Sequence, residues 1–307
     1  MKTVRIISDL HIGVDDGADD FNLDEKEFIR FCREWLERGD SPEPAPESGP
    51  EPKAEPEPKP EQKGERRLVV AGDGFECWES GAGSPESALR SIRANRPELF
   101  AFLTETPGIT LINGNHDAIL RTGSEDFGAV EELKLDYYGW LLYLAHGHQS
   151  DGANSEKKCG CFGRMVAWCV GNGERLIDPD LDVNLEALAE ICGGTRDPKQ
   201  SEEHARKVAQ DEGYDFVGYG HTHVAKVVQW EGGVIYANSG KCRDRNGSLD
   251  VVDVEATPTS LSVVAALRSV KTGEVLKTYG SATREKIAHL GIGESADAPR
   301  ITVHIPC

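Results

Sequence analysis

Acidic, amide and imidazole side chains recur in five short fragments of the 307-residue chain, each after a run of apolar residues. They are Asp9-Leu10-His11, Gly72-Asp73, Gly114-Asn115-His116-Asp117, His146-Gly147-His148 and Gly220-His221-Thr222-His223. Such groups bind Mn, Fe, Zn or Co in mixed oxygen and nitrogen sites. Of the 9 His in the chain, only His204, His289 and His304 lie outside these fragments. Because chance would scatter the histidines, this clustering predicts a metal centre.

The fragments need elements that bring them together, and apolar runs before them supply these. The runs predict strands at Thr3–Ser8, Arg67–Ala71, Ile109–Ile112, Leu141–Ala145 and Asp215–Gly218. Side chains at the carboxyl ends of strands meet at one edge of an open α/β sheet, where ligands bind. Asp9 and His11 are two residues apart in extended chain, so their side chains point the same way.

Further strands and helices complete the expected architecture. Apolar residues at helical spacing predict helices at Asp24–Arg38, Pro85–Thr104, Leu181–Cys192 and Ser201–Glu212. After these, short apolar runs predict strands at Ala225–Trp230, Val234–Ala237, Leu249–Val254, Leu261–Leu267 and Val270–Thr278. Strands that alternate with helices, followed by a strand-rich end, predict an α/β layered sandwich.

All five fragments, in this order between residues 9 and 223, resemble the motifs of the calcineurin-like metallophosphoesterases. The resemblance implies two facing β-sheets flanked by helices, a four-layer α/β/β/α sandwich. It also implies a phosphoesterase with two divalent metal ions, in which a hydroxide between the metals attacks phosphorus in line. Mn is the expected metal, with Fe, Zn or Co as alternatives.

The resemblance assigns a role to each matching residue. It implies that one metal is held by Asp9, His11 and His223, and the other by Asn115, His146 and His221. Asp73 would bridge both, because the two oxygens of a carboxylate can hold cations about 3.5–4 Å apart. His116 would donate a proton to the leaving oxygen or stabilise the transition state, with Asp117 holding its ring.

One fragment departs from the commonest pattern of the family. Glu76 stands where many members have Asp or Asn, three residues after Asp73. This fragment and His146–Asp151 are most similar to the branch of the UDP-diacylglucosamine pyrophosphatases, although that branch has Arg in place of His116. A small phosphorylated substrate is therefore expected, with nucleotide-sugars and lipid-linked compounds as candidates. A nuclease of the same fold and a metal-free interaction scaffold are the alternatives.

The composition and charge of the chain limit which partners it can bind and where in the cell it is expected. The net charge of -19 argues against sequence-independent binding to nucleic acid, which needs Lys and Arg to neutralise phosphates. No run of about 18 apolar residues predicts a membrane span. Met1–Leu10 lacks the apolar region of a signal peptide, so the 8 Cys are interpreted as reduced thiols of a cytoplasmic protein. The sequence does not identify a protein partner.

The chain is expected to form one metallophosphoesterase domain over residues 1–280, followed by a C-terminal extension over 281–307. Ser41–Gly64 is rich in Pro and Glu and lacks large apolar residues, which predicts a disordered insertion or a docking arm for a partner. Residues 150–213 are expected to form a cap or helical insertion. Asn238-Ser239-Gly240 has two open interpretations, an ordinary turn or a segment close to the site.

Overall fold

The computed structural model describes residues 1–14, 21–38, 65–78, 84–123, 125–150, 197–243 and 247–286. The insertion expected at 41–64, the helix expected at 181–192 and most of the expected cap lie outside these residues. So do Cys159 and Cys161, and the end of the chain after residue 286. In the described part of the chain, no helix is long and apolar enough to cross a membrane.

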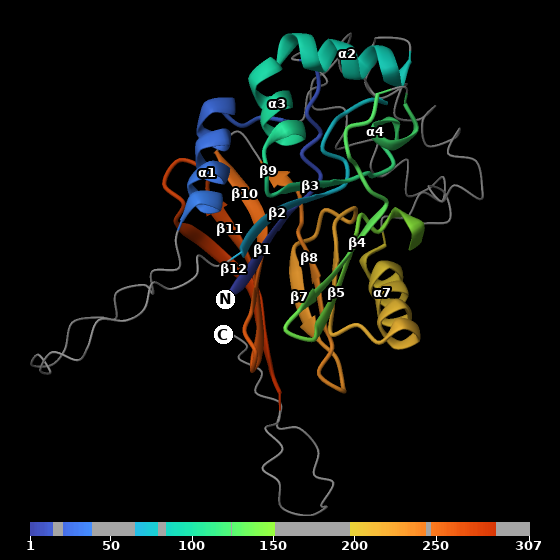
Figure 1. Cartoon of the computed structure of the whole chain (residues 1–307), viewed down its shortest axis with the longest axis vertical. Coiled ribbons are helices and arrows are strands. Elements are labelled where there is room, and N and C mark those ends of the chain that lie inside the picture. Colours follow the sequence, from blue (N-terminus) through green and yellow to red (C-terminus); the bar gives the residue numbers. More distant parts are fainter. Residues whose placement is uncertain are drawn as a thin grey trace, which may run out of the picture.

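Two mixed sheets form the centre of the molecule (Figure 1). The first follows the order β12 (Val275–Glu285), β11 (Ser260–Ser269), β10 (Ser248–Ala256), β1 (Lys2–Ile7), β2 (Glu65–Ala71) and β3 (Ile109–Ile112), with β9 (Cys242–Arg243) paired to β10. The second follows the order β4 (Glu132–Tyr137), β5 (Trp140–Ala145), β6 (Phe216–Tyr219), β8 (Ile235–Asn238) and β7 (Lys226–Gln229). In the first, β1, β2 and β3 are parallel; in the second, β5, β6 and β8 are parallel.

Helices cover the outer face of each sheet. Figure 1 shows α1 (Glu25–Glu37) and α3 (Pro97–Glu105) outside the first sheet, with α2 (Pro85–Asn95) beside α3, and α7 (Pro198–Glu212) outside the second. Two short helices, α4 (Ile119–Thr122) and the 3₁₀ turn η1 (His148–Ser150), follow β3 and β5. The layers therefore run helix, sheet, sheet, helix, as the resemblance implies.

Alternation along the strands explains these layers. On β2, Val69 and Ala71 join the apolar core between the sheets, whereas Leu68 and Val70 pack beneath α1 and α3. Both faces of this strand are buried from Leu68 to Ala71, which is why its sequence is continuously apolar over these four residues. A third core cluster lies between α7 and the second sheet, where Ala205 and Ala209 contact aromatic residues of β5, β6 and β8.

Two predicted elements differ from the structure. The helix expected over Pro85–Thr104 is split at Arg96, because Pro97 has no N–H for the preceding turn and instead begins α3. The strand expected over Val270–Thr278 begins only at Val275, since the chain reverses at Gly273, whose φ is +76° and whose N–H donates to Ser269 O. At its other end β12 continues to Glu285, past residue 280 where the domain was expected to finish.

Candidate metal centre

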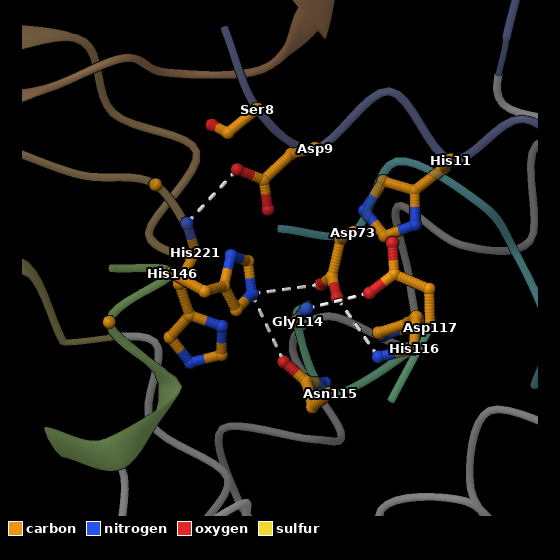
Figure 2. Close-up of polar contacts among 12 residues, drawn as sticks. Ser8, Asp9, His11, Asp73, Gly114, Asn115, His116, Asp117, His146 and His221 are labelled. Atoms are coloured by element: carbon orange, nitrogen blue, oxygen red, sulfur yellow. Dashed lines mark hydrogen bonds and ion pairs between the residues drawn. The ribbon is translucent and has the colours of Figure 1, made fainter. Parts of the chain in front are cut away.

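The five fragments meet at the carboxyl ends of both sets of parallel strands. Asp9 follows β1, Asp73 follows β2, Asn115 follows β3, His146 follows β5 and His221 follows β6. Figure 2 shows these side chains pointing toward one another. All nine residues predicted for the site lie in this cluster, although their separate roles remain predictions.

The backbone of the site is strained. Among the described residues, six that are not glycine have positive φ, and five of them belong to the predicted ligands: Asp9 (52°), His11 (46°), Asp73 (49°), His221 (67°) and His223 (58°). This conformation costs about 1–3 kcal/mol per residue and is found mainly at functional sites. The fold therefore maintains an unfavourable local backbone at the positions where metal ligands are expected.

The first group of ligand atoms comes from the loops after β1 and β6. Asp9, His11 and His223 each offer one atom, and the three atoms lie within 4.8 Å of one another. His223 Nε2 lies 3.2 Å from Asp9 Oδ1, and the other carboxylate oxygen of Asp9 accepts the backbone N–H of His221 at 3.0 Å. Burial opposes ionisation of Asp9, but the nearby His223 outweighs it and the pKa of Asp9 is held below its usual range.

The second group consists of Asp73, His146 and His221, whose ligand atoms also lie within 4.8 Å of one another. His146 Nε2 lies 3.0 Å from Asp73 Oδ2 and 3.2 Å from Asn115 Oδ1. His146 Nδ1 donates to Ala71 O at 2.9 Å, which orients Nε2 toward the carboxylate. Burial lowers the pKa of His146, yet Asp73 and Asp9 raise it to about 9. The raised pKa of His146 means that a proton on its ring would offset the negative charge of Asp73 and Asp9, a role that a bound metal cation could also fill.

Glu76 links the first group to His116. Its Oε2 accepts from Nδ1 of His11 at 2.8 Å and from Nδ1 of His116 at 2.7 Å. Burial opposes ionisation of this carboxyl, but His116 and His11 hold its pKa below the usual range. The ring of Trp78 stacks on the ring of His116 with 4.4 Å between centroids, and Trp78 N donates to Glu76 Oε1 at 2.8 Å. His116 is therefore held along one edge and over one face.

The contact expected between Asp117 and the ring of His116 is absent, and Glu76 makes it instead. The Asp117 carboxylate accepts backbone N–H groups of Gly114 at 2.6 Å, Gly74 at 2.7 Å and Phe75 at 3.2 Å. It thereby ties the loop after β3 to the loop after β2. Burial and the negative charge of Asp73 raise the pKa of Asp117 to about 6.

Two side chains of the site were not identified from the sequence as its parts. Glu76 appears there only as a departure from a family pattern, and Trp78 two residues later carries no signal of its own. The signal in the sequence that could have identified Glu76 is its position three residues after Asp73, where many family members have Asp or Asn. His148 is buried beside the second group, with its ring centroid 5.4 Å from that of His146.

The donor set fits divalent cations. Asp9, Asp73 and Glu76 are buried carboxylates that remain ionised, and buried charge is stable only when it is paired or bound to metal. Oxygen and imidazole donors in both groups suit Mn, Fe, Zn or Co. The described residues contain three groups of ligand atoms that could hold an ion: Asp9–His11–His223 and Asp73–His146–His221 share no residue, whereas His11–Glu76–His116 overlaps the first through His11.

No protein-family model and no curated protein matches the sequence. Among solved structures, a predicted phosphoesterase of Streptococcus pneumoniae is similar over 93% of this chain and 98% of its own, with 15% identity and a TM-score of 0.41. Vps29 of Entamoeba histolytica in complex with Zn is similar over 92% of this chain and 98% of its own, with 13% identity and a TM-score of 0.40. An archaeal phosphodiesterase is similar over 83% of this chain and 93% of its own, with 15% identity and a TM-score of 0.35. The functional interpretation therefore depends on this chain's own residues.

Proposed function

We propose that the chain is a calcineurin-like metallophosphoesterase, a hydrolase of phosphate esters or pyrophosphates that depends on two divalent cations. The observation that carries this proposal is the pair of neighbouring ligand groups, Asp9–His11–His223 and Asp73–His146–His221, built on strained strand-end loops. A structural role would not require two buried groups of acids and imidazoles side by side, since apolar packing is more stable than buried charge.

In this proposal, Asp9, His11 and His223 hold one cation, Asn115, His146 and His221 hold the other, and Asp73 touches both. Bound cations would lower the pKa of water and neutralise charge on the phosphoryl oxygens. The strained loops fix the donor atoms before a cation arrives, so little reorganisation accompanies binding. Mn is the metal we expect, and the donor set also accepts Fe, Zn or Co.

We propose that His116 serves the leaving group. With Nδ1 donating to Glu76 Oε2 at 2.7 Å, Nε2 is the ring nitrogen that can carry a proton to the leaving oxygen. The Glu76 carboxylate fixes the orientation of the ring through this hydrogen bond, and stacking on Trp78 limits its rotation. Glu76 and Trp78 are therefore proposed as positioning residues for His116, in place of Asp117.

The substrate is proposed to be small and phosphorylated. Glu76, Trp78 and the fragment after β5 favour the branch of the UDP-diacylglucosamine pyrophosphatases, whose substrate is a lipid-linked nucleotide-sugar. His116, which replaces the Arg of that branch, favours a different leaving group. The net charge of -19 disfavours the nuclease alternative. Among the described residues, Cys32, Cys77 and Cys242 form no disulfide bond, which suits the reducing cytoplasm proposed as the location.

Metal removal tests the proposal directly. Protein that has been treated with chelator and then freed of it should not hydrolyse phosphorylated substrates until Mn²⁺ is returned. Elemental analysis of the restored protein should then give two ions per chain. Hydrolysis is screened on nucleotide-sugars, phosphodiesters, phosphomonoesters and single-stranded DNA. Full hydrolysis by the metal-free protein would refute the two-metal mechanism, and a protein that binds no Mn²⁺ and hydrolyses none of these substrates would favour the metal-free interaction scaffold.

A matched pair of variants tests the bridging role. Asp73→Asn replaces a buried carboxylate by an amide, which bridges two cations poorly, so both ions should bind more weakly. Asp211→Asn makes the same chemical change on an exposed position of α7 and should retain both ions. If Asp73→Asn binds two ions with the affinity of the control, Asp73 is not the bridge.

A further inference from the structure

The turn after β8 contacts both loops that supply the first ligand group. Asn238 and Ser239 are buried, with 0% and 1% of their surface exposed. Asn238 Nδ2 donates to Gly220 O at 2.6 Å, and its Oδ1 accepts the N–H of Gly240 at 3.0 Å. Gly220 immediately precedes His221, so the Asn238 side chain holds the start of the loop that carries His221 and His223.

The same turn reaches the residue before Asp9. Ser239 Oγ lies 2.7 Å from Ser8 Oγ, and Ser8 Oγ donates to Gly240 O at 3.2 Å. Ser239 N also donates to Tyr219 O at 2.9 Å. Two buried hydroxyls thus join the turn to the end of β1, and a backbone bond joins it to the end of β6.

Close packing leaves this arrangement little freedom. A Cβ on Gly220 would lie 2.4 Å from Ser8 Oγ and 2.7 Å from Asp9 Oδ2, so the two loops touch at a position that only glycine fits. The loops belong to different sheets, and one ligand group spans both: Asp9 and His11 come from the first loop and His223 from the second. Whatever fixes the distance between the loops fixes the geometry of that group.

We propose that Ser8, Asn238 and Ser239 are positioning residues that hold these two loops together, and so set the affinity of the Asp9–His11–His223 group for a divalent cation. The inference rests on the proposed function, because it assumes that the group binds a cation. Four of the strained residues, Asp9, His11, His221 and His223, lie on the joined loops. Such backbone persists only where surrounding contacts over-determine it.

The test compares two serines of equal burial. Ser239→Ala deletes the hydroxyl that meets Ser8 Oγ at 2.7 Å and Tyr219 O at 3.3 Å. Ser201→Ala deletes a hydroxyl beneath α7 that lies 3.4 Å from Tyr236 Oη and is hydrogen-bonded to neither loop; each serine is 1% exposed. Mn²⁺ alone is titrated into the metal-free proteins by calorimetry. One of the two binding steps should weaken about 10–100-fold in Ser239→Ala, as expected for supports of metal ligands, and neither step should weaken in Ser201→Ala.

Further variants keep the inference open to refutation. His223→Ala should weaken the same Mn²⁺ binding step as Ser239→Ala. The double variant Ser8→Ala with Ser239→Ala should lose less Mn²⁺ affinity than the sum of the two single variants, because each single variant already removes the contact between the two hydroxyls. Asn238→Asp keeps the acceptor for Gly240 but loses the donor to Gly220, and serves if an alanine variant fails to fold. Unchanged affinities in Ser239→Ala, or equal weakening in Ser201→Ala, would overturn the inference. If the wild-type protein binds no Mn²⁺, the proposed function itself fails instead.

Discussion

At the scale of single residues, neighbours decide what each ionisable group can do. Four buried carboxyls lie in one site, yet the pKa of Asp9, Asp73 and Glu76 is held low by histidines, whereas that of Asp117 is raised to about 6. The first three are thus suited to cations or imidazole N–H groups. Asp117 faces backbone N–H groups of two loops and has a structural function.

The division of labour around His116 leads to a prediction. His116→Ala should retain two Mn²⁺ ions but lose about 10²–10⁴-fold in rate, because a positioned proton donor contributes that much. The loss should shrink on an ester of nitrophenol, whose leaving group needs no proton. Elemental analysis and rates on two substrates that differ only in the leaving group give both measurements.

His204→Ala is the control for the loss of an imidazole. His204 lies on α7, where its Nδ1 lies 3.1 Å from Tyr219 Oη, and the rate of this variant should stay near that of the wild type. If His116→Ala loses one ion per chain, His116 is a ligand. If it keeps both ions and loses equal activity on both substrates, it stabilises the phosphoryl oxygens rather than delivering a proton.

At the scale of elements, the sequence predicted the strands that carry ligands well and the contacts between their loops poorly. β1, β2, β3, β5 and β6 are apolar and short, so their ends and the residues after them could be located. β4 was missed because Glu132, Lys134 and Asp136 interrupt its apolar residues, as suits a half-exposed edge strand. Glu76 could not be paired with His116 because 40 residues separate them, and only the folded loops bring them together.

Glycine at the loop after β3 gives a prediction about these loop contacts. A Cβ on Gly114 would lie 2.0 Å from Asp73 Oδ1 and 2.5 Å from Asp73 N. Gly114→Ala should therefore displace the loop after β2, cost about 1–3 kcal/mol of unfolding free energy and weaken Mn²⁺ binding. Urea unfolding of the metal-free protein and Mn²⁺ titration measure the two effects separately.

Gly280→Ala is the matched control on β12. There the nearest atoms to an added Cβ are 3.4 Å away, an ordinary contact, so unfolding free energy and Mn²⁺ affinity should be close to those of the wild type. Equal stability and equal affinity in the two variants would show that the loops after β2 and β3 can move apart without loss. The contact of Gly114 with Asp73 would then have no bearing on the site.

At the scale of the whole molecule, the two sheets bring together ligands from distant parts of the sequence. Asp9 and His221 are separated by 212 residues, and the backbone N–H of one donates to the carboxylate of the other. The segment of residues 41–64 lies in sequence between α1 and β2, and β2 begins at Glu65, which pairs with Lys2 at the end of the strand opposite the loop that carries Asp73. A Cβ on Gly108 would lie 3.5 Å from both Leu36 Cδ2 on α1 and Arg66 O on β2, so these two elements flank the same residue.

This neighbourhood supports a prediction for the segment itself. Replacing Ser41–Gly64 by a short Gly/Ser linker should leave hydrolysis of a small substrate close to unchanged, because the segment's composition offers no apolar surface for the core and the elements on either side are already adjacent. A second variant with a Gly/Ser segment of the original length separates the effect of sequence from that of length. Rates and unfolding transitions are compared at equal Mn²⁺ occupancy. A large drop in rate in both variants, with unfolding unchanged, would place the native segment in the active site. A drop only in the shortened variant would mean that length, and not sequence, keeps the loop after β2 in position.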